Sequence, residues 1–277
     1  GSSPRVRGTL QHRRHPLALL CCAWLVTGEA ALANDLPAGI QEAARGLEQA
    51  WKADPRTSGM VFPLITSAAE ANQRPLEACP AARLSAPQAL ALYCPDQGRI
   101  LIDRLRLEAL AARYGAWDAS FWLATALGQA ITASSGQSSG QQGEMAAIAA
   151  NLQAVCFAGT LLGQAPRWQP LADRSRLSVA LTAFPTRLNG QQGTPALRSY
   201  ALLTGLGGTA SDCGAKDIAH LAAGVVPDPE RLRALAAHPD RSNGDGAIDD
   251  VINALCLPKP PLGCPRRLPP ARVRSNP

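Results

Sequence analysis

The chain has 277 residues, of which 46% are hydrophobic and 17% charged, and its formal net charge is +6. This length allows one large domain or two small ones, with a hydrophobic core. The first 33 residues carry four arginines and one glutamate, so the rest of the chain has a charge of only +3, and four of its arginines lie in a Pro-rich tail. A nucleic-acid-binding role therefore has no electrostatic basis.

The first 33 residues are typical of an export signal. Arg13 and Arg14 form a positive segment, "PLALLCCAWLVTG" is apolar but short for a membrane span, and Ala31-Leu32-Ala33 is an A-x-A cleavage site. We expect the mature protein to begin at Asn34 and to reside in the periplasm, in the envelope or outside the cell. The alternative is an uncleaved anchor. No later run is predicted to span a bilayer.

The first part of the mature chain predicts one helix, an irregular stretch and a strand. Apolar residues recur at three- and four-residue steps over 36–55, which indicates an amphipathic helix. Residues 56–98 are irregular, with short extended pieces at "MVFPLI" and "ALALYC". Ile100 and Ile102 share one face of a short strand over 99–103.

Helices dominate the rest of the prediction. An amphipathic helix over 104–115 is followed by one over 119–133, with Asp118 as its N-cap. A low-complexity loop over 134–144 precedes a long helix over 145–162. Further helices are predicted near 174–188, 195–206, 215–223, 229–237 and 247–255. The fold class is therefore α+β, mostly helical, with a small β-sheet.

Six cysteines follow the signal segment, and an even number in an exported chain indicates disulfides. Six cysteines allow fifteen pairings, and their spacing alone does not choose among them. The six are Cys79, Cys94, Cys156, Cys213, Cys256 and Cys264.

Several segments occur in the order typical of one family of zinc enzymes. They are Tyr93-Cys94-Pro95, a strand ending at Asp103, a helix with Gly128, "LQAVCFAG" over 152–159, and Gly193-Thr194 before Cys213. Over roughly 77–213 the chain resembles the neutral zinc metallopeptidase family. The resemblance implies a zincin-like fold stabilised by disulfides.

The residues that would hold zinc in that family are absent from this chain. The family motif HEVGH falls on 125–129, so the two histidine ligands correspond to Thr125 and Gln129, and the glutamate base to Ala126. The third ligand, the glutamate of ELQAD, corresponds to Asn151. The resemblance therefore implies an enzyme site that has lost its three ligands and its base.

Two further substitutions fit the same loss. The family aspartate of ELQAD corresponds to Val155, on the apolar stripe of its helix, where an unpaired carboxylate would be costly. The histidine of the family's HGTS segment corresponds to Gln192. We expect that the former site is converted to packing, with Gly128 at a close contact between two helices.

Other candidate sites are weaker. The mature chain contains only His220 and His238, eighteen residues apart, which does not predict a relocated zinc site. The segment 240–252 resembles a calcium-binding loop, but Arg241 and Ile252 stand where acids are needed. A polar turn that caps the next helix is the preferred interpretation of that loop, with calcium binding left open.

The resemblance and the positions of the cysteines together predict three disulfides: Cys79–Cys94, Cys156–Cys213 and Cys256–Cys264. The predicted organisation is a signal peptide over 1–33 and a degenerate metallopeptidase-like domain over 34–214. A helical C-terminal extension over 215–264 and a disordered Pro/Arg tail over 265–277 follow.

The sequence thus predicts an exported protein that is not an enzyme, with a binding or scaffolding role and no metal or cofactor. A peptide or protein partner is expected, and the oligomeric state stays open. Two alternatives are a hydrolase with an unrecognised or relocated metal site and a structural subunit of an envelope complex.

Overall fold

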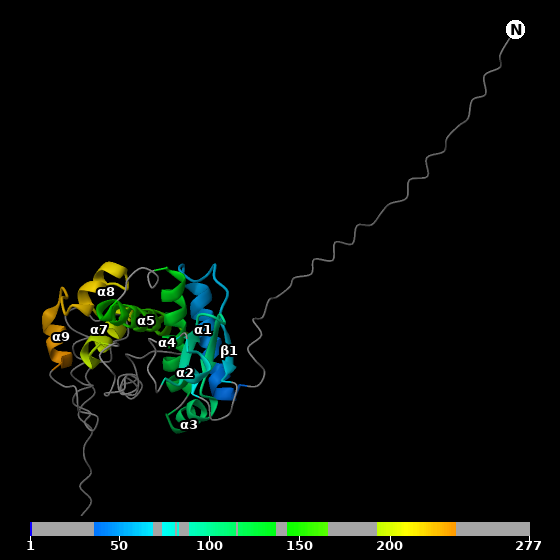
Figure 1. Cartoon of the computed structure of the whole chain (residues 1–277), viewed down its shortest axis with the longest axis horizontal. Helices are drawn as coiled ribbons and strands as arrows, with labels where there is room; N and C mark the ends of the chain where they lie inside the picture. Colours follow the sequence, from blue (N-terminus) through cyan, green and yellow to red (C-terminus); the bar gives the residue numbers. More distant parts are fainter. Residues whose placement is uncertain are drawn as a thin grey trace, which may run out of the picture.

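The computed structural model describes Gly1 and residues 36–68, 74–80, 82, 89–114, 116–136, 143–165 and 193–236. In this part of the chain the fold is α+β and mostly helical, with one three-stranded sheet. The sheet and helices α1 to α3 lie at one end of the molecule, and α7, α8 and α9 lie at the other (Figure 1). Helices α4 and α5 lie between these two ends.

The sheet has the strand order β1-β3-β2. Strand β1 (Leu64–Ser67) pairs parallel to β3 (Arg99–Ile102), and β2 (Ala91–Cys94) pairs antiparallel to β3. A tight turn joins β2 to β3, and Gly98 has φ +61° there, a backbone conformation that glycine adopts readily. Short helix α2 (Pro75–Ala78) packs against β2 and β3.

The long helices form the core. Helix α1 (Ala38–Ala53) packs against α4 (Ala116–Ser134), and α4 packs extensively against α5 (Glu144–Gln164). Helix α3 (Arg104–Tyr114) lies against α1 and α4. Helix α7 (Pro195–Gly205) packs on α5, α8 (Ala215–Ala222) contacts both of them, and α9 (Pro229–Ala236) packs on α7.

The predicted elements are largely confirmed within the described residues, with two corrections. The prediction that Asp118 is an N-cap was wrong, because α4 begins at Ala116 and Asp118 lies in its first turn. Helix α2 was missed, since four residues carry no helical periodicity. The predicted helices over 174–188 and 247–255, the signal segment over 2–33 and the tail over 265–277 lie outside the described residues.

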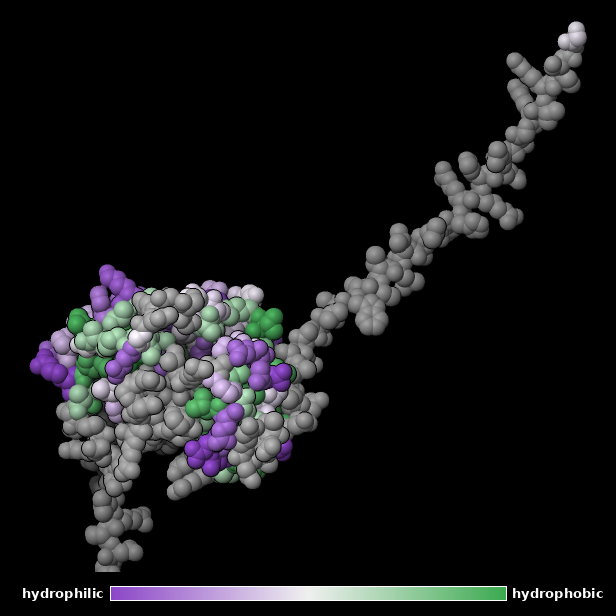
Figure 2. Space-filling view, in the orientation of Figure 1, coloured by the Kyte–Doolittle hydropathy of each residue, from purple (hydrophilic) through white to green (hydrophobic). Residues whose placement is uncertain are grey.

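Helix α5 corrects the expectation that no later run is suited to a membrane. By length and composition it is apolar enough to cross one, with a mean hydropathy of 1.7 over its best window. However, 61% of that window is buried inside the protein, against α4, α7 and α8. Hydrophilic residues lie at both ends of the surface, with apolar residues between them (Figure 2). Burial of this kind is typical of the core helix of a globular domain.

Two of the three predicted disulfides are present. Cys79 is bonded to Cys94, which fastens the end of α2 to the end of β2. Cys156 is bonded to Cys213, which fastens the middle of α5 to the segment before α8. The third predicted pair, Cys256–Cys264, lies outside the described part of the chain.

Candidate functional site

Helices α4 and α5 carry most of the positions that the sequence singles out, and their backbones touch at Gly128. A Cβ atom added there would lie 2.0 Å from the carbonyl oxygen of Ala154. No side chain fits in that space, so Gly128 lies at a close helix contact, as predicted. Thr125 on α4 and Asn151 on α5 each lie three residues, about one helical turn, before this contact.

Thr125 and Ala126, which the resemblance assigns to a ligand and to the base, have different surroundings. Thr125 is half-buried, and its Oγ1 donates a hydrogen bond to the carbonyl oxygen of Phe121, at 3.0 Å, in its own helix. Ala126 is fully buried in the main hydrophobic core. A carboxylate at position 126 would therefore enter an apolar surrounding, where an unpaired charge is costly.

Gln129, which the resemblance assigns to the second ligand, connects helix α4 to the sheet. The Oε1 atom of half-buried Gln129 accepts a hydrogen bond from the backbone N–H of Tyr93 in β2, at 2.9 Å. The backbone N–H of Asp103 donates a hydrogen bond to the carbonyl oxygen of Leu90. In an antiparallel pair only every second residue is hydrogen-bonded to the partner strand, so the N–H of Tyr93 points away from β3. Gln129 thus holds a backbone amide on the outer edge of β2.

Of the two singled-out residues on α5, Asn151 makes a hydrogen bond within its helix and Val155 lies in the core. The Nδ2 atom of half-buried Asn151 donates to the carbonyl oxygen of Ala147, at 3.1 Å, in the same helix. Val155 is 5% exposed and belongs to the main core. Val155 therefore packs in the core, as its place on the apolar stripe of its helix predicts.

The segment matched to the family's HGTS motif lies beside α5. A Cβ atom at Gly193 would lie 3.3 Å from the side chain of Ile148 and 3.5 Å from that of Leu152, which are three residues before and one residue after Asn151 in α5. Thr194 is the N-cap of α7, and its Oγ1 accepts a hydrogen bond from the N–H of Leu197. Gln192 lies outside the described residues.

Sequence reasoning missed two buried polar residues near these positions. Gln153 is 4% exposed, and its Nε2 donates to the carbonyl oxygen of Cys213 at 3.1 Å. Arg198 is 3% exposed, its Nη1 donates to the carbonyl oxygen of Gly193, and burial lowers its pKa to about 10. It stays charged at neutral pH. No sequence pattern distinguishes Arg198 from an exposed helix arginine.

An ion pair between buried Asp54 and exposed Arg56, at the end of α1, was also missed. Asp54 is 1% exposed and accepts hydrogen bonds from Arg56 through both carboxylate oxygens. The Arg56 guanidinium lies 5.0 Å from the ring centroid of Phe157 on α5. The hydrogen bond from Arg56 holds the pKa of Asp54 below its usual value, although burial acts in the opposite direction.

Ionisable residues do not gather into a metal-binding cluster in the described ranges. No three His, Cys, Asp or Glu side chains there lie close enough together to hold a metal ion. His220 is exposed on α8. His238 and the calcium-like loop over 240–252 lie outside these ranges, so calcium binding stays open.

The two central helices therefore each carry half-buried side chains without charge at the positions that the sequence singles out. Trp122, Thr125 and Gln129 are half-buried at three- and four-residue steps along one side of α4, and Asn151 is half-buried on α5. These side chains include polar groups and an aromatic ring, but no nucleophile–base pair and no set of zinc ligands.

The chain matches no family model, no curated protein and no solved structure.

Proposed function

We propose that this protein is an exported, metallopeptidase-like protein without catalytic activity, whose role is to bind or scaffold a peptide or protein partner. The observation that carries the proposal is the hydrogen bond from the Tyr93 N–H to Gln129. Where the related enzymes would hold zinc, this residue ties helix α4 to strand β2.

The other positions support the same interpretation. The polar groups of Thr125 and Asn151 donate to carbonyl oxygens of their own helices, and Ala126 lies in the core. Neutral oxygens and amides are poor zinc ligands beside imidazole, and a dication among them would lack a compensating carboxylate. The half-buried side of α4 that carries Trp122, Thr125 and Gln129 has no charged group, which supports a binding role through packing rather than catalysis.

A metal analysis of the purified mature protein tests the proposal directly. We expect far less than one zinc per chain, and no peptide cleavage with or without added zinc. One tightly held zinc per chain, or cleavage that a chelator abolishes, would show that the protein is an enzyme.

Reconstruction of the family residues tests the resemblance itself. Thr125→His, Ala126→Glu, Gln129→His and Asn151→Glu together should create a zinc site, with Val155→Asp added to orient it. The matched control is the same variant with Thr125 retained, which lacks one ligand and should bind zinc much more weakly. A reconstructed protein that keeps its helical circular dichroism but binds no zinc better than this control would contradict the resemblance.

A further inference from the structure

The sheet separates two hydrophobic clusters, one on each face. Ile65, Ala91, Ile100 and Ile102 belong to the main core, which continues into α1, α4, α5 and α7. On the opposite face lies a much smaller group, here called the outer cluster, which consists of Cys79, Ala82, Leu92, Cys94 and Leu101. Successive strand residues alternate between these two clusters.

The outer cluster depends on a weak element and a covalent bond. Helix α2 covers it, with Leu76 and Ala78 partly buried against it. A helix of four residues is far too short to be stable alone. The Cys79–Cys94 disulfide supplies two of the five buried residues of the cluster and fastens α2 to the sheet.

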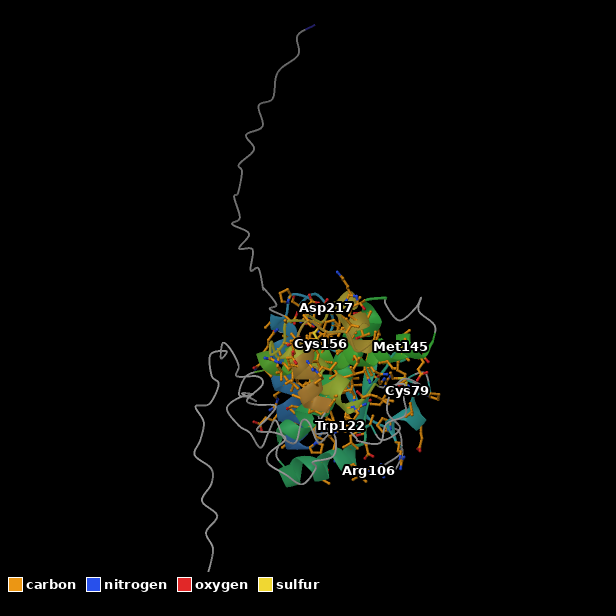
Figure 3. All side chains as sticks on the ribbon, turned by 90° about the vertical axis from the view of Figure 1, so that its left-hand side faces the viewer. Cys79, Arg106, Trp122, Met145, Cys156 and Asp217 are labelled. Atoms are coloured by element: carbon orange, nitrogen blue, oxygen red, sulfur yellow. A yellow bond between two sulfur atoms is a disulfide. The ribbon has the colours of Figure 1, made fainter. Side chains whose placement is uncertain are left out.

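The second disulfide lies in a different part of the protein. Cys156 and Cys213 belong to the main core and join α5 to the segment before α8. Cys79 and Cys156 are well separated in the side-chain view (Figure 3). Opening the Cys79–Cys94 bond therefore leaves the main core and its own disulfide in place.

We propose that the Cys79–Cys94 disulfide is a redox-controlled clasp on the outer face of the sheet. A dithiol reductant opens it by exchange through a mixed disulfide. The bond gains two electrons and two protons to become two thiols, and the dithiol is oxidised to its own disulfide. Helix α2 then detaches and exposes Leu92 and Leu101. This inference does not depend on the proposed function.

Access to the bond requires local opening. Cys79 and Cys94 are each 1% exposed, so a dithiol reaches the sulfur atoms only when the rest of α2 opens transiently around the intact bond. Short, weakly packed segments open in this way without global unfolding. The bond joins residues 15 apart, and its loss removes the covalent restraint on α2, so the population in which α2 is open rises.

Opening of the clasp also affects the contact between β2 and helix α4. Cys94 follows Tyr93 in β2, and the Tyr93 N–H is the group that Gln129 accepts. When the end of β2 is no longer tied to α2, this hydrogen bond breaks more often. The hydrogen-exchange rate of the Tyr93 amide therefore shows whether the clasp is open or closed.

Graded reduction of the oxidised full chain with dithiothreitol tests the proposal. Free thiols are alkylated at each concentration and located by peptide mapping. We expect Cys79 and Cys94 to be labelled first, with the Cys156–Cys213 bond intact, and exchange to rise over 89–102 but not in α7. Reduction of both bonds together with loss of the whole fold, or an α2 segment that stays protected after its bond is reduced, would overturn the proposal.

Two variants separate the clasp from the core disulfide. Cys79→Ser/Cys94→Ser should show the exchange of the selectively reduced protein and bind a hydrophobic dye, whereas Cys156→Ser/Cys213→Ser should not show this local pattern. If Cys79→Ser/Cys94→Ser kept the low exchange of the oxidised protein over 89–102, the clasp would be excluded. If that variant failed to fold, the labelling of the wild-type chain would decide the question.

Discussion

Gly128 of α4 lies directly against the backbone of Ala154 in α5, where an added Cβ atom would be 2.0 Å from the Ala154 carbonyl oxygen. The close approach lets the two central helices pack backbone to backbone. A second contact of this kind joins α5 to α7, where a Cβ atom at Gly205 would lie 1.9 Å from the Cys156 carbonyl oxygen.

Gly128→Ala should therefore destabilise the protein. Overpacking of a tight interior costs about 1–3 kcal/mol, and here backbone atoms must move to relieve the clash. Urea denaturation of the purified variant measures the loss. Gly163→Ala is the matched control on α5, because its new methyl would meet only Leu206 Cδ2, at 3.6 Å. That change should stabilise the protein by up to about 1 kcal/mol. Equal stability of the two variants would contradict the close contact.

The sequence predicts the elements well where periodicity is strong. Helices α1, α5 and α7 carry apolar stripes or turn signals at their ends, and their predicted bounds lie within about two residues of the observed ones. Helix α2 has no such pattern. It depends on contacts with strands that follow it in the chain and on the bond between Cys79 and Cys94.

The candidate site was predicted in part. The burial of Ala126 and Val155 follows from their apolar side chains, and the contact at Gly128 follows from a small residue in an apolar helix. The hydrogen bond between Gln129 and Tyr93 joins residues 36 positions apart. No local pattern predicts it, because it depends on how α4 lies against the sheet. The likeness to zinc enzymes stays a prediction.

Removal of the Cys156–Cys213 disulfide should be the more costly of the two cysteine-pair deletions. The bond joins residues 57 apart, and the chain-entropy model gives a loss of about 4 kcal/mol. Chemical denaturation of Cys156→Ala/Cys213→Ala measures it. The Cys79→Ala/Cys94→Ala variant should lose less, because α2 can detach while the main core persists. A Cys156→Ala/Cys213→Ala variant as stable as the wild type would refute this account.

Asp54→Asn should lower stability at neutral pH and have a smaller effect in acid. The folded pKa of Asp54 lies below its ordinary value, so its ionised form stabilises the fold above the unfolded pKa of about 3.9. That contribution is lost as the pH falls through the folded pKa. We expect a loss of about 1–3 kcal/mol at pH 7, and a gap to the wild type that narrows below about pH 5.

Denaturation curves of the wild type and of Asp54→Asn between pH 7 and pH 2 measure the difference between their free energies of unfolding. Asp96→Asn in the exposed turn between β2 and β3 is the control for the loss of one charge, and it should change stability by less than about 0.5 kcal/mol. A gap for Asp54→Asn that stayed constant over this range would show that the ionised carboxylate does not stabilise the fold through Arg56.

Gln129→Met should weaken the attachment of β2 to α4. Methionine has nearly the shape of glutamine but lacks the oxygen that accepts the Tyr93 N–H, so a partly buried donor loses its partner. We expect a loss of about 1–2 kcal/mol in the free energy of unfolding and faster hydrogen exchange at the Tyr93 amide. Gln129→Glu keeps an acceptor at this position and should preserve the slow exchange.

Thr125→Val is the matched control. The Thr125 hydroxyl donates only to a carbonyl oxygen of its own helix, and that oxygen also accepts a backbone hydrogen bond within the helix. Its loss should therefore cost less than about 0.5 kcal/mol. If Gln129→Met and Thr125→Val lowered the free energy of unfolding by the same small amount, Gln129 would not hold strand β2. The hydrogen bond to Tyr93 would then no longer support the proposed function.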